Sequence, residues 1–385
     1  MGTSHRTFFA TCAPGVEPIL HDEVRALRFA RAERQVGGVL FRGTLQDAWR
    51  ANLWLRTAVR VLMRLGRFEA RDGDALYRAV DAVDWSTYLR PDGTLWVQAQ
   101  SRESALDHTR FAAQRVKDAI VDQLRTGSGE RPSVSRDQPD LRVHLHLYRD
   151  RATLSVDTSG ESLHKRGWRR SPGRAPLPET LAAAMVLAGE WDRRAPLLDP
   201  LCGSGTLLIE AAWIAHGFAP GLLRERFGFD TWPGHDGAAF ERLREEARSA
   251  RSIRRKLRLA GGDVDPERVA DARENAEQAG VGELVEVEPA DALDLTPRRG
   301  WNAWIASNLP FGERVRSGSD VPRFHTDFGR VLRERCVGFH VSLLAGSPAL
   351  ADALTLPGAR RTTLGFGGTE RVLLTGEIAA PAGST

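Results

Sequence analysis

The chain has 385 residues, of which 42% are hydrophobic and 27% charged, which is enough for two or three domains with their own cores. The 54 Lys and Arg residues exceed the 50 Asp and Glu residues so slightly that net charge alone argues weakly for nucleic acid. No stretch approaches the roughly 20 consecutive apolar residues that span a bilayer, and the N-terminus shows no leader pattern. We therefore expect a cytoplasmic, monomeric protein with no membrane partner.

The cysteine and histidine patterns argue against a metal site. Cys12, Cys202 and Cys336 are far apart and form no CxxC pair, so neither a disulfide framework nor a zinc or iron-sulfur site is indicated. His144 and His146 alternate with apolar residues, and no third ligand is near them in sequence. We interpret both as residues on the solvent face of a strand, and we predict no metal.

The first 158 residues predict two α+β units. The first unit, residues 1–65, is expected to contain strands at 6–12 and 36–43 and helices at 16–27 and 47–53. The second unit, residues 66–158, is expected to contain helices at 74–82 and 109–124 and strands at 94–101, 141–150 and 151–159. In the strand from 141, apolar residues recur with period two, which places them on one face: Leu141, Val143, Leu145 and Leu147.

Residues 159–385 have a different texture, in which strands and helices alternate after a polar, basic connector at 159–176. The predicted strands lie at 195–199, 258–265, 284–291, 301–308, 338–346, 362–368 and 371–378, with helices at 206–215 and 266–280. An arginine-rich segment at 241–258 predicts a solvated amphipathic helix. This alternation is typical of a doubly wound α/β sheet that binds its ligands at the carboxyl ends of the strands.

The segment LLDPLCGSGTLLIEAA, residues 197–212, predicts a ligand-binding loop. A buried strand ends at Asp199, Gly203 and Gly205 permit a tight turn, and an apolar helix starts near Thr206. An ordinary strand-to-helix turn is the alternative interpretation. A dinucleotide loop would have a third glycine where this chain has Leu208, and a P-loop would end in Gly-Lys-Ser/Thr, so both phosphate ligands are disfavoured.

S-adenosylmethionine carries no phosphate and needs acceptors for its ammonium group and ribose hydroxyls. Asp199 near the loop and Asp263 at the end of the next strand are candidates, although Asp263 in isolation would more often cap a helix. Asp291, after the third strand, is a candidate acceptor for the adenine amino group. The sequence thus favours S-adenosylmethionine as the cofactor.

The segment SNLPFGER, residues 307–314, stands at the end of the fourth strand and predicts methyl transfer to a conjugated amine. The lone pair of such an amine is delocalised until acceptors hold its N–H groups, so that it turns toward the methyl donor. Asn308 Oδ1 and the backbone carbonyl of Leu309 are the expected acceptors, with Pro310 stiffening the loop and Phe311 stacking on an extruded base. An ordinary turn with a half-buried Phe is the alternative.

These motifs together resemble the THUMP-domain guanine-N2 RNA methyltransferases, in particular the RlmL-type family that modifies 23S ribosomal RNA. The resemblance rests on FFATCAPGVEPILHDEVRAL, RLGRFEARDGDALYRAVDAVDW, DTSGESLHKRGWRR, PLPETLA, LLDPLCGSGTLLIEAA, APGLLRERFGFDTW and NLPFGER, and it covers nearly the whole chain. It implies a ferredoxin-like domain at 1–65, a THUMP RNA-binding domain at 66–158, and a class I, Rossmann-like, seven-stranded methyltransferase domain at 159–385. It further implies guanine N2 as the methyl acceptor.

By position, the resemblance assigns residues to three roles. The catalytic set is Asn308, Leu309, Pro310 and Phe311, and the cofactor-binding set is Thr180, Asp199, Gly203, Gly205, Thr206, Asp263, Val264 and Asp291. The connector residues Lys165, Arg166, Trp168, Arg169 and Arg170 are expected to contact RNA.

Two departures from the family pattern stand out. Leu309 replaces the first proline of Asn-Pro-Pro-Tyr/Phe, which restores an N–H and is expected to loosen the loop. Some relatives carry a second methyltransferase domain, and we expect no second modification by this chain.

Three other functions remain open at this point. A transfer RNA guanine-N2 methyltransferase shares the THUMP architecture, and a DNA adenine-N6 methyltransferase shares the Asn-x-Pro-aromatic chemistry. A non-catalytic RNA-binding assembly factor would explain Leu309, although intact Asn308, Phe311 and the cofactor loop argue against it.

Overall fold

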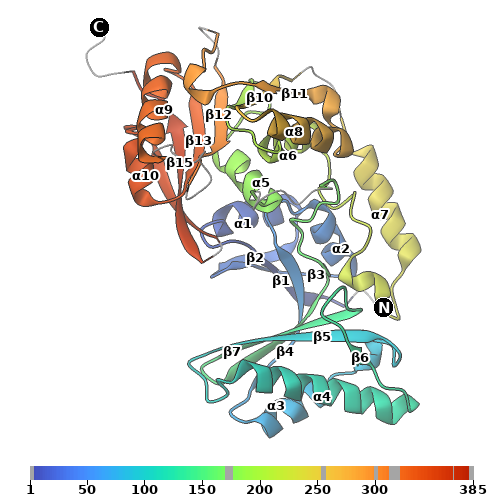
Figure 1. Cartoon of the computed structure of the whole chain (residues 1–385). Coiled ribbons are helices and arrows are strands. Elements are labelled where there is room, and N and C mark those ends of the chain that lie inside the picture. The colour runs from blue at the N-terminus through green and yellow to red at the C-terminus, as the bar shows by residue number, and fades with distance from the viewer. Residues whose placement is uncertain are drawn as a thin grey trace. The chain divides into compact units, whose positions relative to one another are not determined.

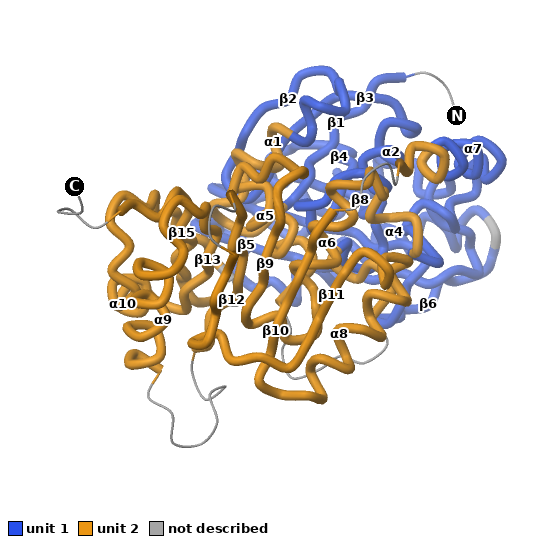
Figure 2. Tube along the Cα trace, turned by 90° about the horizontal axis from the view of Figure 1, so that it is seen from above, with its two compact units in different colours: residues 1–11, 23–163, 224–246 blue, residues 12–22, 164–223, 247–385 orange. Residues whose placement is uncertain are grey.

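The computed structural model describes residues 4–169, 177–252, 257–298, 302–311, 321–366 and 368–380. The chain divides into two compact units, and each draws on segments that are distant in sequence (Figure 2). The first unit comprises residues 1–11, 23–163 and 224–246, and the second comprises 12–22, 164–223 and 247–385.

The first unit begins with a β-α-β-β-α-β arrangement typical of a ferredoxin-like fold. The elements of this arrangement are β1 (Arg6–Thr11), α1 (Glu17–Ala26), β2 (Ala30–Gln35), β3 (Gly38–Gly43), α2 (Leu45–Trp54) and β4 (Arg60–Glu69), of which α1 belongs to the first unit only from Glu23 onward. Thr44 and Asp47 form a reciprocal capping box that starts α2. The predicted elements are all present, whereas β2 and β4 were not predicted. Most β2 residues are exposed, so its sequence carries no apolar alternation.

The rest of the first unit extends the same sheet. Its elements are α3 (Gly73–Asp81), η1 (Trp85–Thr87), β5 (Thr94–Arg102), α4 (Thr109–Ser128), β6 (Ser133–Val134), β7 (Leu141–Tyr148) and β8 (Arg151–Asp157). The eight strands run in the order β2-β3-β1-β4-β8-β7-β5-β6, and α3 and α4 lie on one face of this sheet (Figure 1). The period-two prediction for β7 is confirmed, because its apolar residues are buried and the intervening ones are not. The domain boundary predicted at 65/66 falls inside β4, which pairs with β1 on one edge and β8 on the other.

Residues 224–246 also belong to the first unit, although they follow the glycine-containing segment 197–212 of the second unit in sequence. They form η2 (Gly228–Thr231) and most of α7 (Gly237–Ser249). Phe229 and Phe240 pack their rings against Trp49 of α2. Three Arg224 guanidinium hydrogen bonds reach the carbonyls of Ser159, Glu161 and Ser162 after β8. The helix predicted at 241–258 is present only in its first half, because α7 ends at Ser249 and residues 250–252 and 257–258 are not helical. The apolar side of α7 is packed through Phe240.

The second unit has the class I methyltransferase topology that the family resemblance implies. Its strands are β9 (Leu197–Asp199), β10 (Leu259–Asp263), β11 (Val285–Pro289), β12 (Trp304–Asn308), β13 (His340–Ala345), β14 (Arg360–Phe366) and β15 (Thr369–Glu377). They form one sheet in the order β11-β10-β9-β12-β13-β15-β14, in which β15 alone runs antiparallel to the other strands. Its helices are α5 (Glu179–Ala188), α6 (Thr206–His216), α8 (Pro266–Gln278), α9 (Val321–Arg335) and α10 (Pro348–Ala353), with short turns η3 (Gly282–Leu284) and η4 (Ala292–Asp294).

The strand order of this second sheet reverses between β9 and β12. From β9 the chain proceeds outward to β10 and β11, and it then returns to β12 on the other side of β9. Ligands of open α/β sheets bind at such a switch point, outside the carboxyl ends of the strands. None of the helices in the described ranges combines the length and hydropathy that crossing a membrane requires.

Candidate active site

The loop from β9 to α6 is shaped by two glycines with left-handed backbone conformation. Gly203 has φ +52° and Gly205 has φ +80°, values that residues with a side chain rarely adopt. A Cβ on Gly205 would also lie 3.1 Å from Cβ of Ala272 in α8, so only glycine allows this close approach. At Gly203 no heavy atom lies within 4 Å of that position, which leaves open space beside the loop.

The neighbouring strand and helix hold the loop through backbone groups. Asp263, at the end of β10, accepts a 3.1 Å hydrogen bond from the Gly203 N–H through one carboxylate oxygen. Its other oxygen accepts from the Asp265 N–H, and Asp265 is the residue that caps α8. Asn275 of α8 donates to the Ser204 carbonyl at 3.0 Å. Asp263 therefore fixes the loop, and its carboxylate retains lone pairs for further donors.

Arg169 joins the loop to α5, a contact that the sequence did not predict. Its guanidinium donates to Glu179 Oε1 at 3.0 Å, Ser204 Oγ at 2.8 Å and Thr206 Oγ1 at 2.7 Å. The Arg169 side chain is only 13% exposed and that of Glu179 only 6%. One rigid guanidinium thus orients both hydroxyl groups of the loop. The sequence around Arg169 does not predict this role, because the residues that its side chain contacts lie 10 to 37 positions further along the chain.

Asp199 connects the cofactor loop to the strand that carries the catalytic motif. Its Oδ1 accepts a 2.7 Å hydrogen bond from the Ser307 hydroxyl and a 3.2 Å bond from the Leu201 N–H. The side chain is almost fully buried. Burial raises the pKa of Asp199 to about 7. The two hydrogen bonds lower this pKa, and the nearby charge of Asp263 raises it slightly.

Asn308 ends β12 one residue after that hydrogen bond. Its Oδ1 is buried and has no hydrogen-bond partner within the part of the chain that the structure describes. A buried acceptor without a donor costs stability, so such an atom in a native site points to a missing ligand donor. This is the acceptor that the sequence assigned to the amine.

Leu309 restores an N–H to the loop, and this N–H is not left unpaired. Its N–H, which a proline would lack, donates a 3.0 Å hydrogen bond to the Leu344 carbonyl in β13. Its side chain is fully buried in the core formed with Phe328 and Leu343. The departure from the family pattern therefore replaces proline stiffness with an anchor to the next strand.

Phe311 has one aromatic contact already in place. The Arg371 guanidinium lies 4.2 Å from the centroid of its ring, and the ring packs closely on Gly346. Pro310 and Phe311 are both partly exposed. Residues 312–314 of the motif lie outside the described residues.

Three other predicted cofactor residues have distinct environments. Thr180 is buried in α5. Val264, directly after β10, is 50% exposed, unusual for a large apolar side chain. Asp291 is exposed, and its carboxylate caps η4 through the Leu293 N–H at 2.9 Å.

The connector residues predicted to contact RNA are mostly turned inward. Arg166 is 2% exposed and forms an ion pair with the buried Glu210 of α6 at 3.0 Å, and Trp168 is 1% exposed. These two side chains offer almost no surface to RNA in this structure, because their packing inside the second unit occupies them. Lys165 is exposed. Arg170 lies outside the described residues.

Other chemistries find little support in the described residues. They contain no group of three or more His, Cys, Asp and Glu that could hold a metal ion. Burial raises the pKa of Cys202 and that of Cys336, to about 12 for the latter, so neither thiol is primed as a nucleophile.

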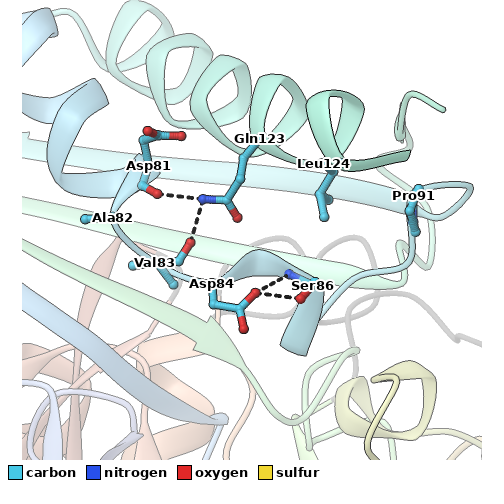
Figure 3. Close-up of a pocket in the computed structure, with 9 residues that line it drawn as sticks. Asp81, Ala82, Val83, Asp84, Ser86, Pro91, Gln123 and Leu124 are labelled. Carbon is cyan, nitrogen blue, oxygen red and sulfur yellow. Dashed lines mark hydrogen bonds between the residues drawn. The ribbon is translucent and has the colours of Figure 1, made fainter. Parts of the chain in front are cut away.

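A hollow of about 570 Å³ lies in the first unit, between the end of α3, η1 and α4 (Figure 3). In it, Gln123 donates to the carbonyls of Asp81 and Val83, and Asp84 accepts from Ser86. These polar groups therefore satisfy one another and do not converge on a ligand.

Comparisons with known proteins agree with this geometry. Residues 166–374 match the RMKL-like methyltransferase domain family UPF0020. The chain belongs to this RMKL-like methyltransferase family. Residues 7–62 match the RlmL ferredoxin-like domain and residues 70–157 match the THUMP domain, as the resemblance implied.

The relatives of this RMKL-like chain include longer proteins. It is 42% identical to a ribosomal RNA large subunit methyltransferase K/L of Pseudomonas paraeruginosa over 90% of this chain and 49% of the relative. A protein of the same name from Syntrophotalea carbinolica is 42% identical over 97% of this chain and 53% of the relative. The chain thus spans about half the length of these curated relatives.

Two solved structures are similar over nearly their whole length. SMU.472, a putative methyltransferase complexed with SAH, is 30% identical with a TM-score of 0.87 over 99% of both chains. A predicted N6-adenine-specific DNA methylase from Listeria monocytogenes is 30% identical with a TM-score of 0.85 over 97% of both chains.

Family membership gives S-adenosylmethionine as the methyl donor, and the residues present fit it. The loop beside Gly203 has open space, and α6 starts at Gly205 without a side-chain cap. Asp263 has lone pairs to spare, and no lysine of a P-loop type follows the glycines. When bound, the donor supplies an electrophilic methyl group.

The raised pKa of Asp199 predicts a pH-dependent stability. Its carboxyl stays protonated in the folded chain up to about pH 7, whereas in the unfolded chain it ionises above its ordinary value of 3.8. Its stabilising contribution is therefore complete below about pH 4 and is lost as the pH rises to 7, by about 1.4 kcal/mol per pH unit. Relative to wild type, Asp199→Asn should gain about 3 kcal/mol in the free energy of unfolding between pH 5 and 8.

Urea unfolding followed by circular dichroism at both pH values measures this gain, with the exposed Asp352→Asn as control. A difference between Asp199→Asn and wild type that does not change with pH would contradict the prediction.

Proposed function

We propose that this chain transfers a methyl group from S-adenosylmethionine to the exocyclic N2 of a guanine in RNA, with 23S ribosomal RNA as the substrate. The observation that carries the proposal is the unpartnered, buried Oδ1 of Asn308, which ends β12 beside the glycine loop after β9. An exocyclic amine brings the N–H group that this oxygen lacks.

The catalytic residues act by orientation. Asn308 Oδ1 accepts one N–H of the amine, and the Leu309 carbonyl is the proposed acceptor for the other. These two hydrogen bonds draw the lone pair out of conjugation with the ring and direct it at the methyl group. Phe311, whose ring centroid lies 4.2 Å from the Arg371 guanidinium, is the proposed stacking partner of an extruded base.

The cofactor residues divide into those that bind and those that hold the loop. Asp263 is proposed to accept the ribose hydroxyls, and Val264 to contact the adenine through its exposed apolar surface. Asp199 lies at the base of the loop, where an ionised carboxylate would face the ammonium group. Arg169 and Glu179 keep the loop hydroxyls in place.

Two features support ribosomal RNA as the substrate. The relatives at 42% identity carry the name ribosomal RNA large subunit methyltransferase, and a THUMP domain precedes the methyltransferase domain here as well. A DNA adenine-N6 methyltransferase is the second candidate, because the Listeria structure was described as a predicted enzyme of that kind. A guanine of transfer RNA is the third candidate, because the THUMP-domain methyltransferases that the chain resembles include enzymes for ribosomal RNA and enzymes for transfer RNA.

A substrate comparison separates these candidates. The purified chain is incubated with radiolabelled S-adenosylmethionine and, in parallel, with 23S ribosomal RNA, bulk transfer RNA and duplex DNA. We expect label in ribosomal RNA, with N2-methylguanosine as the labelled nucleoside in mass spectrometry. Label in DNA adenine or in transfer RNA instead would contradict ribosomal RNA as the substrate. Label in none of the three nucleic acids would contradict the proposed methyltransferase activity.

Asn308→Ala is expected to lower kcat by at least about 100-fold, because one acceptor of the transition state is lost. The affinity for S-adenosylhomocysteine, measured by calorimetry, should change little, because Asn308 is proposed to bind the amine and not the cofactor. Asn302→Ala, an exposed residue before the same strand, is the matched control. Full activity of Asn308→Ala would refute the assigned role.

Arg169→Ala should weaken S-adenosylhomocysteine binding by about 10- to 100-fold, because three charge-assisted hydrogen bonds to the loop and α5 disappear. Arg169→Lys should also weaken it, since an ammonium group cannot replace the planar fork. The exposed Arg194→Ala serves as control. An unchanged cofactor affinity combined with weaker RNA binding would restore the original prediction that Arg169 contacts RNA.

A further inference from the structure

The sheet of the first unit carries α3 and α4 on one face (Figure 1). Along β7 and β8, polar side chains that point to the opposite face alternate with buried apolar ones. On that opposite face the strand registers align residues into rows across β4, β8 and β7. Arg67, Thr153 and His146 form one row, and the neighbouring row is Arg64, Ser155 and His144. We call this surface the open sheet face and define it by Arg64, Arg67, Arg142 and His146.

Positive charges on the open sheet face confront one another. Arg67 is exposed, and it has no ion pair or hydrogen bond through its side chain among the residues described. Burial and the adjacent Arg67 both lower the pKa of Arg64, and burial and Arg64 lower the pKa of His146. Arg64 and Arg67 lie three residues apart on β4, so their like charges repel, and this repulsion costs the fold stability unless an anion binds there.

The carboxylates of this face are already used. Asp157 is buried and pairs with Arg60 and, at 3.4 Å, with His144. Glu69, at the far end of β4, pairs with Arg71 at 2.8 Å. The charges of Arg64 and Arg67 are therefore not neutralised by these acids.

Arg142 extends the cationic surface along β7 toward an aromatic ring. Its Nε is buried without a hydrogen-bond partner among the described residues. Burial, Arg60 and Arg136 lower the pKa of Arg142, and the carboxylates of Asp157 and Glu161 oppose part of this decrease. Trp96 lies opposite Arg142 in the register of β5 and β7, and the Arg136 guanidinium lies 5.9 Å from its ring centroid. Arginine beside a partly exposed indole is a common surface for stacking on a base or ribose.

We propose that the open sheet face binds the phosphodiester backbone of RNA. Arg64, Arg67 and Arg142 contact phosphates, while the exposed Gln98 and Gln100, which continue the rows onto β5, offer donors and acceptors to ribose 2′-hydroxyls. Amide and hydroxyl groups between the cations favour RNA over an acidic protein surface. This inference rests on the proposed function and names the surface by which the substrate is held.

The test compares two double variants with equal loss of charge. Arg64→Gln with Arg67→Gln alters the open sheet face, and Arg78→Gln with Arg125→Gln alters exposed arginines of α3 and α4 on the covered side. Binding of a 23S ribosomal RNA transcript is measured by filter binding over a range of KCl concentrations. We expect the face variant to lose about 10-fold or more in affinity and its salt slope to fall by about 1 to 2, while the control changes less than about twofold.

Two further measurements separate folding and catalysis from this result. The face variant should melt at the same or a higher temperature than wild type, because a repulsion is removed, and its S-adenosylhomocysteine affinity should be unchanged. Equal RNA affinity of face and control variants would overturn the proposal, as would displacement of the RNA by polyglutamate at equal charge concentration. If the wild-type chain transfers no methyl group but the face variant still loses RNA affinity, the proposed function is contradicted and the proposed RNA-binding surface is supported.

Discussion

The hydrogen bond from Ser307 to Asp199 is the interaction on which the active site depends. It ties the end of β9, where the cofactor loop begins, to the end of β12, where the catalytic loop begins. The two strands are neighbours only because the strand order reverses between them. The sheet topology therefore sets the position of Asn308 relative to Gly203, and the buried carboxyl of Asp199 fixes the final register. A carboxyl whose pKa is near 7 makes this link sensitive to the charge of what binds beside it.

The sequence was informative wherever the physical signal is local. The glycine turn and the Asn-x-Pro-Phe element are local patterns, and a doubly wound α/β sheet was predicted from strand and helix alternation, whereas its seven-stranded class I form was implied by the family resemblance. β4 was missed because a bulge between Arg64 and Gly66 shifts its alternation at mid-strand. α5 was missed because nearly all of it is buried, so no helical period separates an apolar face from a polar one.

The roles of the arginines were not predictable from the sequence. Arg166 and Arg169 stand in a basic segment that is typical of RNA contact, yet one pairs with a buried glutamate and the other holds the cofactor loop. Arg64 and Arg67 stand in an inconspicuous strand, yet they carry charge that the described carboxylates do not neutralise. The difference arises from partners 35 to 44 residues away in the chain for Arg166 and Arg169, and from cross-strand register for Arg64 and Arg67. The density of charged residues along the sequence reveals neither the distant partners nor the cross-strand register.

Leu309 shows how a family motif can change in sequence and keep its physical function. Proline stiffens a loop by fixing φ and removing a donor, whereas leucine keeps the donor and must satisfy it. Here the Leu309 N–H meets the Leu344 carbonyl of β13, and the larger side chain fills the core under the loop. A hydrogen bond to the neighbouring strand β13 thus holds Leu309, where a proline would act by restricting the backbone. The anchoring hydrogen bond uses the Leu309 N–H and leaves aside its carbonyl, which is the second acceptor proposed for the amine, so the substitution gives no reason to regard the chain as inactive.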